Sequence, residues 1–215
     1  MHAPPSNDPK LWYARLAAAI AWFALLLQLW LSIEIARANG EGAWHGVWMY
    51  VAFFTILTNL LAATALAAAA LGRSTSFLAS PSAVTGIAAS IILVSVAYNL
   101  LLRNVWNPQG WQLVADLILH DFTPLLFVGW WWLAASAQPL RYTEILRWCA
   151  YPIAYFAYAM ARGALSGFYP YPFIDVPVLG VGQVIVNALM ILLSFALIAA
   201  LLIAIGRFRT RRVRA

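Results

Sequence analysis

Six long apolar runs, separated by short polar breaks, constrain this 215-residue chain more than any other feature. A helix needs about 20 mostly apolar residues to cross a bilayer, and each run meets that length. None of the runs alternates apolar and polar residues as a membrane β-strand would. The pattern predicts six membrane-spanning helices, at about residues 12–36, 47–71, 82–102, 113–136, 145–165 and 181–206.

Composition agrees with a membrane protein of one domain. Only 9% of the residues are charged, whereas a soluble domain devotes roughly 25% to charged residues. The single cysteine, Cys149, excludes an intramolecular disulfide framework. Because the segments between the runs are short, we expect one all-α transmembrane domain over residues 1–215.

Basic residues predict the orientation, because positive charge accumulates on the cytoplasmic side. With six spans both termini share a side, and ten basic residues fall there: Lys10, Arg15, Arg73, Arg141, Arg147, Arg207, Arg209, Arg211, Arg212 and Arg214. Three fall on the other side: Arg37, Arg103 and Arg162. Both termini are therefore expected in the cytoplasm, with the arginine-rich tail attracting anionic lipid rather than nucleic acid. The first run is longer than a signal-peptide core, which favours a retained signal anchor.

The few polar side chains gather near the outer ends of the predicted spans. They are Glu34, Arg37, His45, Thr55, Thr58, Asn59, Asn99, Arg103, Asp116, His120, Asp121, Arg162, Gln183 and Asn187. Polar groups are costly in a bilayer and usually face a bundle interior or a watery cavity. Since all six spans contribute such a group, we expect one shared cavity that opens outward.

Thr55 and His120 are the strongest candidates for chemistry in that cavity. They lie eight and seven residues inside spans two and four, which places both about 10–12 Å below the outer boundary. Asp116 lies one turn before His120 on the same face and could orient the imidazole. Asn59 lies one turn after Thr55 and could stabilise an oxyanion. A hydroxyl, an imidazole, a carboxylate and an amide form a minimal set for acyl transfer.

Simpler interpretations of these residues stay open. A threonine in a spanning helix commonly bonds a carbonyl of the preceding turn, and a lone buried histidine is often structural. His45, Asp116 and His120 show no zinc-ligand spacing, so no metal is expected. The loop over Tyr169–Phe173 either caps the cavity or lies on the membrane interface.

Five motifs, together spread over nearly the whole chain, resemble a known family. They are 53-FFTILTNL-60, 98-YNLLLR-103, 106-WNPQGW-111, 119-LHD-121 with Pro124, and Arg162-Gly163 through 169-YPYPF-173. They resemble the bacterial six-span Pr-six-Pr membrane proteins. That family is distantly similar to the eukaryotic androgen-induced and androgen-dependent membrane proteins, which are six-span threonine hydrolases of fatty-acid esters of hydroxy fatty acids.

The resemblance implies a bacterial inner-membrane protein with its threonine nucleophile on span two and its histidine on span four. By position these are Thr55, which follows two aromatic residues, and His120, which precedes Pro124. Both surroundings depart from the eukaryotic pattern, so Thr58 stays open as an alternative nucleophile.

The sequence therefore predicts a membrane hydrolase of lipid-like esters that needs no cofactor and acts with membrane lipids and an acyl substrate as its partners. Asn59, Asn99 or Arg103 would offset oxyanion charge, and Arg162 could bind a substrate carboxylate. The alternative is a non-enzymatic transporter, channel or lipid-binding protein that uses the same polar cluster. Oligomeric state is left open by the sequence.

Overall fold

The computed structural model describes residues 8–73, 76–135, 137 and 139–214, and every regular element within them is helical. The longer helices are α1 (Pro9–Ala38), α2 (Ala43–Tyr50), α3 (Phe54–Ala70), α4 (Pro81–Ala97), α5 (Trp111–Leu117), α6 (Thr123–Ala134), α7 (Glu144–Ser166) and α8 (Val176–Arg214). The short turns are η1 (Phe77–Ala79), η2 (Tyr98–Leu102), η3 (Ile118–Phe122) and η4 (Pro172–Ile174). Ser136, the expected last residue of the fourth span, lies outside the described residues.

Within the described residues, four helical segments are long and apolar enough to cross a membrane, or five if the bent pair α2 and α3 is one span. They are Pro9–Ala38, Pro81–Leu102, Trp111–Ala134 and Val176–Arg212. The expected fifth span coincides with α7, which is 23 residues long but is not in this set. Glu144, Arg147 and three tyrosines make α7 less apolar than the others. The described residues thus form an all-helical protein in which several helices are long and apolar enough to span a membrane. The six membrane crossings stay a prediction.

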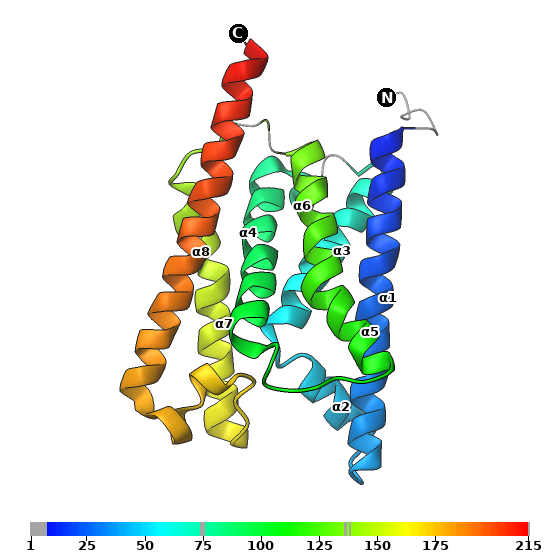
Figure 1. Cartoon of the computed structure of the whole chain (residues 1–215), viewed down its shortest axis with the longest axis vertical. Coiled ribbons are helices and arrows are strands. Elements are labelled where there is room, and N and C mark those ends of the chain that lie inside the picture. The colour runs from blue at the N-terminus through cyan, green and yellow to red at the C-terminus, as the bar shows by residue number, and fades with distance from the viewer. Residues whose placement is uncertain (1–7, 74–75, 136, 138, 215) are drawn as a thin grey trace.

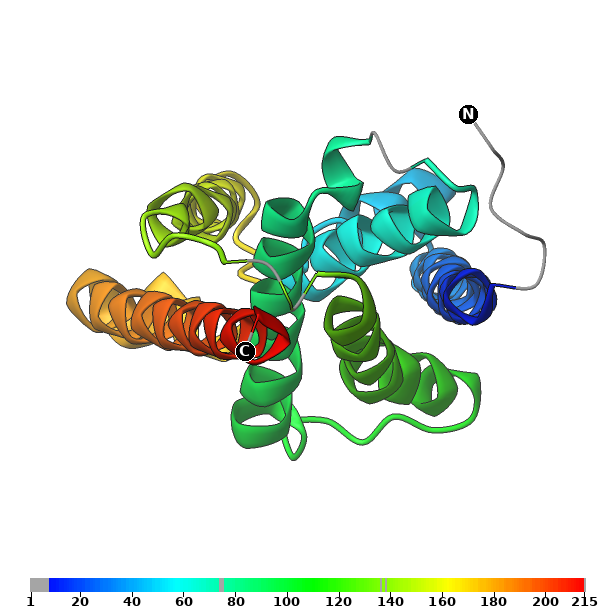
Figure 2. The ribbon, with the colours of Figure 1, turned by 90° about the horizontal axis from the view of Figure 1, so that it is seen from above.

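The long helices run side by side, with α4 in the middle. Figure 2 shows α7 and α8 on one side of α4 and α1, α3 and α6 on the other. Small residues on α4 allow this close packing. A methyl group added to Gly86, for example, would lie 2.8 Å from the Trp148 ring of α7. The first turn of α1 and the last turn of α8 lie at the same end of the molecule (Figure 1).

The second expected span is not one continuous helix. α2 and α3 meet at an angle of 81° across Val51–Phe53, a segment with neither proline nor glycine. The carbonyls of Val51 and Ala52 instead accept hydrogen bonds from the hydroxyls of Tyr158 (3.2 Å) and Tyr155 (2.9 Å) of α7. Side chains from a distant helix therefore satisfy the backbone where the helix breaks, as buried irregular backbone in a membrane requires.

Candidate active site

The break between α2 and α3 places Thr55 at the amino end of a helix. Phe53 is the N-cap residue of α3, and its side chain cannot accept a hydrogen bond from the amides of the first turn. The Thr55 amide instead donates to the Tyr171 hydroxyl over 3.4 Å. Because the first amides of a helix have no helical acceptor and carry partial positive charge, this end of α3 favours a negatively charged oxygen.

Two π-helical turns carry most of the remaining polar groups. η2 follows α4 and bears Tyr98 and Asn99, and η3 separates α5 from α6 and bears His120 and Asp121. Pro124 has no N–H for the His120 carbonyl, and its ring would clash with that carbonyl in a regular helix. The wider turn before Pro124 avoids this clash. Such turns are rare and frequent at functional sites.

Thr55 and His120 are in contact. The Thr55 Oγ1 atom lies 3.4 Å from His120 Nε2, and Thr55 is 9% exposed. The depth expected for Thr55 assumed an unbroken second span, whereas the break makes it the second residue of α3. The Val51 and Ala52 carbonyls, which a helical threonine here would bond, already accept from tyrosines of α7. The Thr55 hydroxyl is thereby available to His120.

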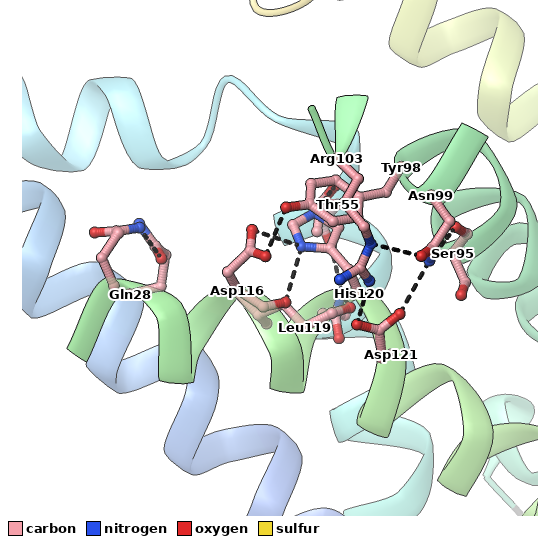
Figure 3. A network of polar contacts seen from close by, with 12 residues as sticks. Gln28, Thr55, Ser95, Tyr98, Asn99, Arg103, Asp116, Leu119, His120 and Asp121 are labelled. Carbon is pink, nitrogen blue, oxygen red and sulfur yellow. Dashed lines mark hydrogen bonds and ion pairs between the residues drawn. The ribbon is translucent and has the colours of Figure 1, made fainter. Parts of the chain in front are cut away.

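Asp116 fixes the orientation and tautomer of His120. The Nδ1 atom of His120 lies 2.9 Å from the backbone carbonyl oxygen of Asp116 and 3.2 Å from the Oδ1 atom of the Asp116 side chain (Figure 3). Two acceptors at Nδ1 require that nitrogen to carry the proton, so the neutral ring presents Nε2 to Thr55 as an acceptor. Within the described residues Oδ1 has no hydrogen-bond partner, so the carbonyl is the direct acceptor and the carboxylate acts by its charge.

Tyr98, which the sequence analysis did not single out, completes this arrangement. Its hydroxyl donates to Asp116 Oδ2 over 2.6 Å, and its ring stacks on the His120 ring with the centroids 3.7 Å apart. The Arg103 guanidinium lies over the Tyr98 ring, 5.2 Å from its centroid. The position of Tyr98 directly before Asn99, in a motif of the resembled family, was the available signal.

Asn99 and Arg103 bind Asp121 and so connect the two π-helical turns η2 and η3; among the described residues, Thr55 is not one of their hydrogen-bond partners. The Asn99 amide donates to Asp121 Oδ1 over 2.9 Å, and Arg103 forms an ion pair with Asp121 Oδ2 (Figure 3). Asn59 is a second link, because its amide donates to the carbonyls of Thr55 (2.8 Å) and Leu119 (3.2 Å). All three side chains act on the site by holding α3, η2 and η3 in place.

Thr58 and Arg162 lie away from the pair. Thr58 is fully buried, and its hydroxyl bonds the Tyr151 hydroxyl over 2.9 Å. Arg162 is 2% exposed and lies 3.8 Å from the centroid of the Trp48 ring, with hydrogen bonds to Tyr158 and to the Met49 sulfur. Neither is among the described residues that line the cavity at Thr55.

That cavity has a volume of about 280 Å³, and we call it the polar chamber. Its lining includes Thr55, Tyr98, Asp116 and His120 together with the loop residues Pro170, Tyr171 and Pro172. The loop therefore forms part of the cavity wall, which favours the interpretation that it caps the cavity. Among the described residues that line the chamber, none comes from α7 or α8, so the expectation of a polar group from every span is wrong. Gln183 of α8 bonds Asn187 instead, and Glu34 of α1 pairs with Arg37.

The polar chamber also contains a glutamine pair that the sequence analysis missed. Gln112 donates to Gln28 over 2.9 Å, and Gln28 is 3.5 Å from Ser32. Within the described part of the chain, the buried Oε1 atom of Gln112 has no hydrogen-bond partner. The signal was Gln28 and Ser32, one turn apart on one face of an otherwise apolar helix.

In the described residues, no three His, Cys, Asp or Glu side chains gather at one point where they could hold a metal ion.

Comparison with models of protein families, with curated proteins and with solved structures finds no match to this chain. The resemblance to the Pr-six-Pr proteins therefore stays a prediction carried by the motifs.

Proposed function

We propose that this chain is an integral-membrane hydrolase of lipid-like esters, with Thr55 as nucleophile and His120 as base. The single observation that supports it best is the contact between Thr55 Oγ1 and the acceptor nitrogen of His120, at the wall of a cavity. We place it in a bacterial inner membrane with six crossings and both termini in the cytoplasm, as the basic residues predict.

The reaction has two steps. Thr55 Oγ1 attacks the ester carbonyl while its proton passes to His120 Nε2. The tetrahedral intermediate then expels the alcohol, whose oxygen takes the proton from His120, and an acyl-threonine forms. Water, deprotonated by the same nitrogen, releases the fatty acid and regenerates Thr55.

The oxyanion is assigned to the amino end of α3. The Thr55 amide, which now donates to the Tyr171 hydroxyl, is one assigned donor to the oxyanion, and the Tyr171 hydroxyl, displaced from the amide by the ester oxygen, is the other. Burial raises the pKa of Tyr171 above its usual value, so the phenol keeps its proton at neutral pH. Asn59, Asn99 and Arg103 are assigned positioning roles, because their donors are engaged elsewhere.

The test uses purified protein in lipid nanodiscs and a panel of fatty-acyl esters. We expect Thr55→Ala and His120→Ala each to lower kcat by at least about 100-fold, as loss of a nucleophile or a general base does. Thr58→Val is the matched control, because Thr58 lies about one turn along the same helix and is also buried.

Two outcomes would refute the proposal. Activity unchanged in both the Thr55 and the His120 variants would remove the pair from the mechanism. Saturable ester binding without turnover in the wild type would instead favour the lipid-binding alternative.

A further inference from the structure

A second cavity, of about 270 Å³, adjoins the first, and its walls are almost entirely apolar. We call it the apolar chamber. It lies between α4, α7 and α8, and its lining includes Leu93, Ala97, Pro152, Phe156, Ala188 and Leu192. Two further lining residues, Ile153 and Leu189, are 51% and 59% exposed. The wall of the chamber therefore includes side chains on the outer surface of α7 and α8, which in a membrane protein would contact the acyl chains of lipids.

The two chambers meet at the candidate nucleophile. Thr55, Tyr98, Leu102 and Tyr171 line both of them. His120, in contrast, is described only in the lining of the polar chamber. The site is thus asymmetric about Thr55, with the base on one side and apolar walls on the other.

We infer that the two chambers sort the two halves of the ester, with the hydrocarbon chain of the acyl group in the apolar chamber and the alcohol in the polar chamber. The inference rests on the proposed hydrolysis. Its reason is that His120 must give its proton to the departing oxygen, so the alcohol has to lie on the side of His120. The acyl carbon is bonded to Thr55 at that moment, and its chain extends away from the alcohol, into the other chamber.

The polar chamber also specifies the kind of alcohol. Gln28, Ser32 and Gln112 line this chamber, and their amide and hydroxyl groups can exchange hydrogen bonds with a polar alcohol. Gln112 and Gln28 therefore fit an alcohol that carries a second hydrogen-bond donor, such as a hydroxyl or an amide. The substrate class is an ester of a single long acyl chain with such a donor-bearing alcohol.

The test fills the apolar chamber and measures the dependence on chain length. Ala188→Trp on α8 places a large side chain in the wall of the apolar chamber. In the wild type we expect kcat/KM to rise by about fourfold per added methylene, from butyrate to dodecanoate esters of one alcohol. In Ala188→Trp we expect the kcat/KM of the dodecanoate ester to fall at least tenfold more than the kcat/KM of the butyrate ester, each relative to the wild type.

Two comparisons give this experiment its controls. Ala196→Trp introduces the same side chain eight residues further along α8, and Ala196 is not among the described residues of either chamber. It should keep the wild-type chain-length profile. Gln112→Leu should leave that profile unchanged but reduce, about tenfold, the preference for an alcohol with a second hydroxyl over its deoxy analogue.

The outcomes separate the two proposals. If the wild type cleaves no ester, the proposed hydrolysis fails, and the sorting fails with it. If the wild type is active but Ala188→Trp slows short and long esters equally, or changes only the preference for the alcohol, the sorting is wrong while the hydrolysis stands.

Discussion

Replacing Asp116 by asparagine tests how the acid supports His120. The substitution keeps the size and shape of a side chain that is 3% exposed but removes its negative charge. It leaves the backbone carbonyl of residue 116 in place, 2.9 Å from His120 Nδ1. The orientation and the tautomer of the imidazole are therefore preserved, and what is lost is the charge that stabilises the imidazolium.

The expected loss follows from this division. A hydrogen-bonded or closely paired charged group contributes about 1.5–3 kcal/mol, which corresponds to a factor of about 10–150 in rate. The analogous change in a serine-protease triad costs about 10⁴ because there the tautomer is lost as well. We therefore expect Asp116→Asn to lower kcat by about 10–150-fold with little change in KM.

The assay is steady-state hydrolysis of a soluble fatty-acyl ester by protein in nanodiscs, with thermal unfolding as a check of the fold. Tyr98→Phe is the matched control. It removes the hydroxyl that donates to Asp116 Oδ2 but keeps the ring stacked on His120. Because this hydroxyl acts on His120 only through Asp116, we expect a smaller effect on kcat, of about fivefold or about 1 kcal/mol.

Two results would contradict this reasoning. If Asp116→Asn is as active as the wild type, the carboxylate plays no part in the transition state. If it is as inactive as His120→Ala while folding normally, the carboxylate rather than the carbonyl fixes the tautomer.

Two further predictions concern the loop over the polar chamber. Tyr171→Phe should lower kcat by about 100-fold and leave KM nearly unchanged, because one oxyanion donor is lost; unchanged kcat, measured beside Thr55→Ala, would remove the hydroxyl from the mechanism. Gly163→Ala should displace the loop, because the added methyl would lie 2.2 Å from the Tyr169 ring. We expect a lower unfolding temperature and reduced activity, whereas Gly182→Ala, with open space around it, should change neither.

The sequence located most of the polar cluster but assigned some of its members wrongly in space. Thr55, His120 and Asp116 were predicted to meet, and the structure brings them together. Spacing of four residues along a helix predicts the pairing of Asp116 with His120, because it fixes which side chains share a face. The meeting of Thr55 with His120 was predicted from their similar depths in two different spans. It does not say what a side chain bonds, and Asn59 proved to bridge two backbone carbonyls.

The choice between two threonines needed the structure. Thr55 and Thr58 lie three residues apart on the same helix, so their sequence environments are alike. Contacts from helices far along the chain distinguish them, since Thr58 is bonded to Tyr151 of α7 and Thr55 faces His120 of η3. No local pattern carries that information.

The sequence by itself determined that this is a helical membrane protein, because apolar runs of about 20 residues have no other low-energy form in a bilayer. Only the tertiary structure decided where a helix breaks. Val51–Phe53 contain no helix-breaking residue, and the break exists because Tyr155 and Tyr158, a hundred residues later, supply the hydrogen bonds that the helix gives up. That break places Thr55 at a helix end beside His120.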